Sequence, residues 1–98
     1  MLFTFAKLPP DDNGDAAHIV RVAAWLLAEK YDGCTARIIS QSDDGNVVTV
    51  SLGIASGIES VECFEWFTQL LADRSLTLVR DHHFERAMRQ VRDVPKPA

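Results

Sequence analysis

The alternation of hydrophobic and polar positions divides the chain into six regular segments followed by a short amphipathic stretch. Residues 2–8 are rich in aromatic and β-branched types and end at a Pro-Pro pair, which is typical of a strand. Residues 16–31 repeat apolar side chains at helical spacing after a turn cluster rich in capping residues. We therefore expect a strand and then a helix that ends at Gly33.

The middle of the chain has the pattern of a β-hairpin. Residues 34–41 read as one strand, and residues 46–54 alternate cleanly between apolar and polar positions, as a strand with one buried face does. The four residues that connect these two strands, Ser42 to Gly45, contain an Asp-Gly pair, which favours a turn with positive φ.

After the hairpin, the pattern again predicts a helix followed by a strand. Ser56 and Glu59 have the S-x-x-E spacing of a capping box, and the apolar periodicity after them predicts a helix that runs to about Asp73. Residues 76–79 read as a fourth strand. Asp81 is placed to cap a last short helix, whose apolar stripe comprises Phe84, Ala87, Met88 and Val91.

The order β-α-β-β-α-β with a terminal helix predicts a ferredoxin-like α+β domain with a mainly antiparallel four-stranded sheet. Each long helix has a single apolar face, so we expect both on one face of the sheet. The other face must be polar, covered by the last helix, or packed against a second copy, and we expect a homodimer. The domain is predicted to span residues 1–93, with a flexible tail over 94–98.

Composition narrows the class of protein. The chain has 98 residues, a net charge of −4 and 47% hydrophobic residues, which indicates a folded domain and excludes a strongly basic nucleic-acid binder. It has no signal-peptide pattern and no apolar run of the length of a membrane span, so we expect a cytoplasmic protein. The two cysteines, Cys34 and Cys63, form no C-x-x-C motif and are expected to be buried thiols.

No residue pattern points to catalysis, a metal or a cofactor, and we expect none of them. His82 and His83 are adjacent, and neighbouring side chains on a helix or strand point in different directions, so we do not expect them to share a metal ion. The glycine-containing loop over residues 53–57 lacks the Lys-Ser/Thr of a P-loop. The chain also has no G-x-S-x-G nucleophile motif.

The tryptophans and charges carry the strongest functional pattern. Trp25 falls almost opposite the apolar face of the first helix, with Arg21 one turn away. Either the rest of the chain covers this indole, or it is an interface anchor. Trp66 borders a stripe on the second helix that comprises Glu59, Glu62, Glu65, Gln69 and Asp73. That stripe is either a solvated face or a contact surface for a basic partner.

The charges also separate along the chain. Residues 1–75 hold eleven acidic and five basic residues, whereas residues 76–98 hold three acidic and five basic ones. The last helix carries a secondary basic surface of Arg86, Arg89 and Arg92. This surface has three possible counterparts: the acidic surface of the same chain, that of a second subunit, or a nucleic acid.

These observations favour a non-enzymatic protein-binding module, a small acidic inhibitor of a larger basic partner that handles nucleic acids. Immunity proteins and phage anti-defence inhibitors of the anti-CRISPR type work in this way, with acidic side chains occupying a surface made for phosphates. One alternative is a small-molecule-binding or enzymatic ferredoxin-like dimer, with Cys34, His82 and His83 as the polar groups of its pocket. The other is a nucleic-acid-binding module that uses the last helix.

Overall fold

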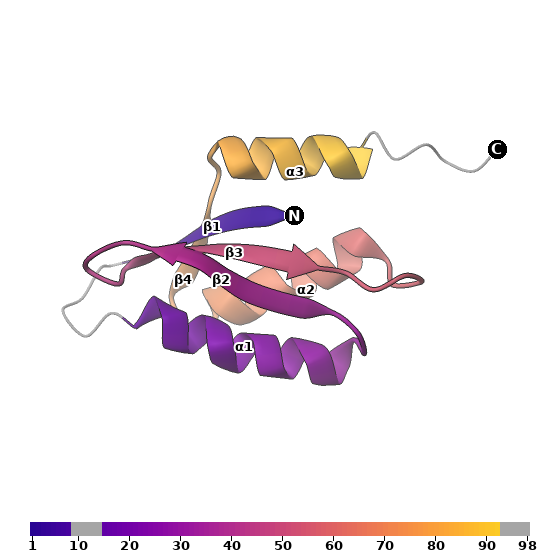
Figure 1. Ribbon diagram of the computed structural model, residues 1–98, viewed down its shortest axis with the longest axis horizontal. Helices are drawn as coiled ribbons and strands as arrows, with labels where there is room; N and C mark the ends of the chain where they lie inside the picture. The colour runs from indigo at the N-terminus through magenta and orange to yellow at the C-terminus, as the bar shows by residue number, and fades with distance from the viewer. Residues whose placement is uncertain (9–14, 93–98) are drawn as a thin grey trace.

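The computed structural model describes residues 1–8 and 15–92, and within the last helix the side chains up to residue 89. The described chain is an α+β fold with a four-stranded antiparallel sheet and three helices (Figure 1). Its elements are β1 (Leu2–Lys7), α1 (Ala16–Lys30), β2 (Thr35–Gln41), β3 (Val47–Gly53), α2 (Ser60–Ala72), β4 (Leu76–Val79) and α3 (His82–Arg92). Every predicted element is present, with bounds that differ by at most a few residues. The predicted tail over 94–98 lies outside the described residues.

The strands follow the order β2-β3-β1-β4, and all three pairings are antiparallel. The first strand is therefore central: Thr4 pairs with Thr49 of β3 on one side and with Val79 of β4 on the other. The β2–β3 hairpin turns at Gly45, whose φ of 75° confirms the positive-φ turn expected from the Asp-Gly pair. Asp44 holds this turn by accepting hydrogen bonds from the Ser42 hydroxyl and the Asn46 backbone N–H.

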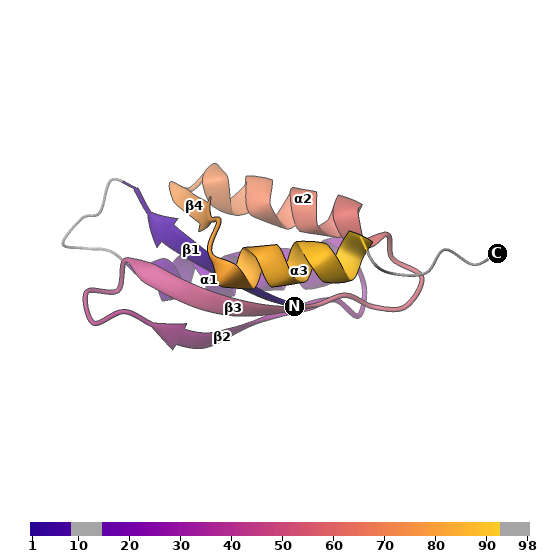
Figure 2. The ribbon, with the colours of Figure 1, turned by 90° about the horizontal axis from the view of Figure 1, so that it is seen from above.

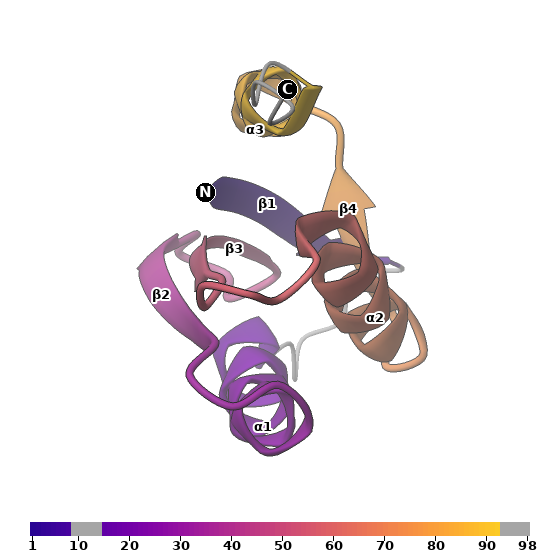
Figure 3. The ribbon, with the colours of Figure 1, turned by 90° about the vertical axis from the view of Figure 1, so that its right-hand side faces the viewer.

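The main core lies between the sheet and the α1–α2 layer, which covers one face of the sheet (Figures 2 and 3). Phe3 of β1 stacks on Phe64 of α2 with ring centroids 4.6 Å apart, and Phe5 meets Phe67 edge to face at 6.2 Å. Aromatic pairs in such geometries contribute about 0.5–1.5 kcal/mol beyond their burial. The alternate positions of β3 complete this layer with Val48, Val50 and Leu52, all of them buried.

The third helix lies on the opposite face of the sheet from α1 and α2, as Figure 3 shows. It packs against β1 through Ala87, which is 2% exposed, with Phe84 and Met88 partly buried beside it. Of the three possibilities considered for this face, the last helix covers the part over β1, whereas Ile39 of β2 and Val47 of β3 stay exposed. The homodimer stays a prediction.

Candidate functional site

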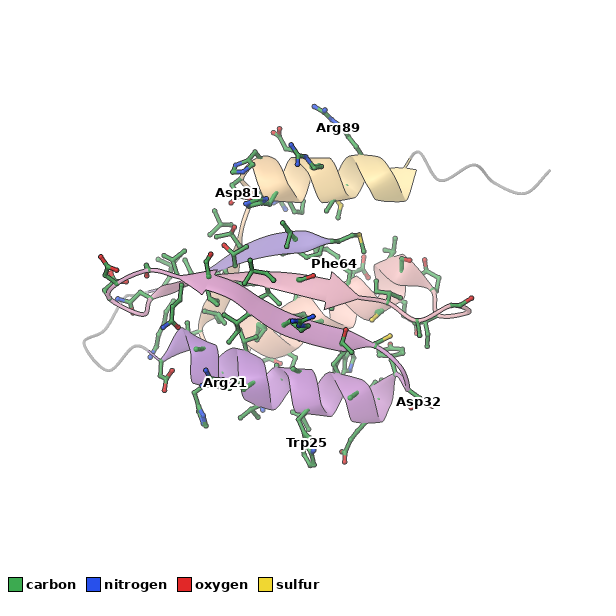
Figure 4. All side chains as sticks on the ribbon, viewed as in Figure 1. Arg21, Trp25, Asp32, Phe64, Asp81 and Arg89 are labelled. Atoms are coloured by element: carbon green, nitrogen blue, oxygen red, sulfur yellow. The ribbon has the colours of Figure 1, made fainter. Side chains whose placement is uncertain are left out.

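Trp25 projects from α1 away from the sheet (Figure 4). The side chain is 63% exposed, and Val22, one turn earlier, is 37% exposed. The helix already fills its place in the core with other residues, namely Ala16, Ala17, Val20, Ala23 and Leu27. The indole is thus exposed, and packing among residues 1–8 and 15–92, which the structure describes, does not explain it.

The residues around Trp25 give this face of α1 a mixed character. Arg21 and Glu29, at i−4 and i+4, are both exposed and share the face of the indole. Asp15 fixes the start of the helix, because its carboxylate accepts a hydrogen bond of 3.0 Å from the His18 backbone N–H. The Trp25 face therefore combines an exposed aromatic and an aliphatic side chain with charges of both signs, held on a capped helix.

The acidic stripe of α2 is exposed along its whole length: Glu59, Glu62, Glu65, Gln69 and Asp73 all face solvent. Glu59 has a second role as the N-cap, because its carboxylate accepts hydrogen bonds from the backbone N–H groups of Val61 and Glu62. The sequence placed the cap at Ser56, and this was wrong. The chain makes a further turn at Gly57, with φ of 88°, before the helix begins at Ser60.

Trp66 joins the two helices. Its ring meets Tyr31, just after α1, edge to face at 5.8 Å, and it is half-buried against the core. Burial raises the pKa of the Tyr31 hydroxyl, and the charge of Glu62 adds to the effect. Glu62 of the acidic stripe therefore lies near the end of α1.

The basic side chains of α3 lie across the sheet from this surface. Arg86 and Arg89 are exposed, while the side chain of Arg92 lies outside the described residues. Arg80, just before the helix, lies over the ring of Phe84 at 5.6 Å from its centroid. Arg86 borders a cavity with Met1, Leu2 and Ala87, whereas Met88, next to Arg89, lines another cavity together with Glu65 of the acidic stripe.

Cys34 and the two histidines do not line one pocket. Cys34 is buried in the core with Cys63, whereas His82 and His83 begin α3 on the other side of the sheet. His83 instead borders a small cavity of about 190 Å³ with Met1, Leu2, Arg86 and Ala87. The pocket proposed for an enzymatic or small-molecule-binding dimer therefore does not form from these three residues within the chain.

The histidine pair itself corrects another expectation. The rings of His82 and His83 lie side by side, with centroids 4.0 Å apart, instead of pointing in different directions. Sequence reasoning also missed Val22 and Tyr31 as parts of the α1–α2 surface. Val22 lies one turn from Trp25, so helical spacing could have found it. Tyr31 could be found only from the packing of α1 on α2.

Comparison of the chain with protein-family models, with curated proteins and with solved structures finds no match. None of the described helices is both long enough and apolar enough to cross a membrane.

Proposed function

We propose that this protein is a non-enzymatic binding module that docks a larger basic protein on the outer surface of α1 and α2. The observation that carries the proposal is Trp25, a large aromatic side chain exposed by 63% on a helix that does not need it for its core. Tryptophan and arginine are the residue types most enriched among interface hot spots. In Trp25 and Arg21 this face offers both, one helical turn apart.

The acidic stripe on α2 is the reason for proposing that the partner is basic. Glu62 and Glu65 are exposed beside Trp66, and α2 has no basic residue in its last turn. Such a surface attracts a basic protein during the encounter and penalises acidic competitors. A partner that handles nucleic acids fits this chemistry, because carboxylates can occupy the positions of phosphates. This is the mode of action of an inhibitor of the immunity or anti-defence type.

The strand order β2-β3-β1-β4 supports placing the domain in the ferredoxin-like class, because each crossover helix joins two strands that flank a third. We place its activity in the cytoplasm, where buried free cysteines such as Cys34 and Cys63 stay reduced.

The test is affinity capture from a host lysate with three variants of the full chain. Trp25→Ala should weaken capture of the partner by about thirtyfold or more, the effect of a hot-spot residue. Ile39→Ala is the matched control, because Ile39 is exposed by 56% on β2, outside the proposed surface. The charge-reversed variant Glu62→Arg/Glu65→Arg should slow association and reduce its dependence on salt. Equal capture by wild type and Trp25→Ala would reject the proposal.

A further inference from the structure

Three consecutive residues at the junction of β4 and α3 bring metal-ligating side chains together. The carboxylate of Asp81 and the imidazoles of His82 and His83 each offer a ligand atom, and these atoms all lie within 4.8 Å of one another. Figure 4 labels Asp81 where the helix begins. The cluster lies across the sheet from the proposed docking surface and has no part in it.

The carboxylate is held in place by its surroundings. Asp81 caps α3 by accepting hydrogen bonds from the backbone N–H groups of His83 and Phe84, at 3.0 and 3.2 Å. Thr4, a buried residue of β1, lies beside this carboxylate. A ligand that is oriented by second-shell hydrogen bonds binds a metal without first being ordered.

The imidazoles are poised in different ways. His83 is half-buried and borders the cavity of about 190 Å³, whereas His82 is exposed, with its ring centroid 4.0 Å from that of His83. In tetrahedral coordination with bonds of about 2.0–2.1 Å, ligand atoms lie about 3.3 Å apart. The ligand atoms of the cluster lie within 4.8 Å of one another, so side-chain rotations must shorten the longer separations when an ion binds.

We propose that Asp81, His82 and His83 form a binding site for a divalent transition-metal ion such as Zn²⁺, with water at its remaining positions. Two imidazoles and one carboxylate are the donor set that suits zinc and its neighbours, whereas calcium and magnesium select oxygen ligands. Arg80 and Arg86 flank the cluster and oppose a cation, so the affinity is moderate. The bound ion links the imidazoles in the first turn of α3 to Asp81, which lies beside Thr4 of β1.

The test is titration of the untagged full chain with Zn²⁺ alone, followed by calorimetry and by amide NMR shifts. We expect one saturable site with a dissociation constant below about 100 μM and shift changes centred on residues 80–86. His82→Ala and His83→Ala should each lower the affinity by about tenfold or more. His18→Ala is the matched control, because His18 is an exposed histidine on α1, and this variant should bind like the wild type.

A variant at Asp81 needs a residue that keeps the helix cap. Asp81→Ser retains a capping side chain and removes the carboxylate, so α3 should form while zinc affinity falls. The proposal is overturned by the absence of saturable binding up to 1 mM Zn²⁺, or by unchanged affinity in both His82→Ala and His83→Ala. Shift changes centred on Cys34 and Cys63 would also overturn it, because they would place the ion at the thiols.

Discussion

The thiol of Cys63, in the first turn of α2, lies close enough to the sulfur of Cys34, just before β2, for Cys34 to raise its pKa. Both residues are buried, and the Cys34 sulfur also accepts a hydrogen bond of 3.3 Å from the Ala55 backbone N–H. Two cysteines from distant parts of the chain are thus neighbours in the core. Burial, with the nearby Cys34 sulfur, raises the pKa of Cys63 from 9.0 to about 12.

This pKa predicts how stability changes at alkaline pH. The folded-state pKa lies above the unfolded value, so the stability that Cys63 contributes is complete below pH 9 and is lost as the pH rises toward 12. Urea unfolding at pH 7, 9 and 10.5 should show a steeper alkaline loss in the wild type than in Cys63→Ala, in which this group is missing. Identical pH dependence in the two proteins would contradict the assignment.

The two tryptophans should differ in their effect on folding. Trp25→Ala removes an exposed side chain and should change the free energy of unfolding by no more than about 0.5 kcal/mol. Trp66→Ala removes a half-buried ring and its contact with Tyr31, and should cost about 2 kcal/mol. Denaturant unfolding of the pair measures both values. A large loss in Trp25→Ala would mean that the indole supports the domain and is not free for a partner.

The cap of α3 can be tested separately from the metal. Asp81→Ala leaves the backbone N–H groups of His83 and Phe84 without their acceptor and should cost about 1 kcal/mol. Asp81→Ser should recover most of this loss, since serine is a good N-cap. Hydrogen exchange should show faster amide exchange in α3 of the alanine variant, with the amides of β1 and β3 much less affected. Uniform exchange across the molecule would contradict a local role.

Two glycines with similar backbone angles form a matched pair. Gly33 and Gly57 have φ of 86° and 88°, and an added Cβ at Gly33 would lie 3.1 Å from the Cβ of Ala55, whereas one at Gly57 would meet nothing within 4 Å. Both alanine variants carry backbone strain of about 1–2 kcal/mol. Thermal unfolding should therefore show a larger loss for Gly33→Ala than for Gly57→Ala. Equal losses would show that Ala55 moves to admit the new Cβ, and a larger loss at Gly57 would contradict the prediction.

The features that sequence predicted well are those that depend on neighbouring residues. Asp81 caps α3 as expected, and Gly45 adopts the positive φ that the Asp-Gly turn requires. The cap at Ser56 failed for an equally local reason, since the turn at Gly57 delays the helix and Glu59 takes over the N–H groups.

Packing contacts between segments that are far apart in the sequence could not be predicted from the sequence pattern. An amphipathic pattern shows that α3 has an apolar face, but it does not show which face of the sheet that helix covers. The Cys34–Cys63 contact and the meeting of Tyr31 with Trp66 depend on how α1 and β2 pack against α2. The exposure of Trp25 was one of two open alternatives until the core of α1 was known.

The central place of β1 has a consequence for the order of folding. Of the four strands, β1 is synthesised first. Its two neighbours, β3 (Val47–Gly53) and β4 (Leu76–Val79), are synthesised much later. During synthesis, one edge of β1 therefore stays unpaired until β4 has left the ribosome. A topology of such long-range pairings folds more slowly than one built from local hairpins. Until β4 is available, the exposed edge of β1 is open to wrong partners, so purified chains truncated before residue 76 should bind chaperones more strongly than chains that include β4.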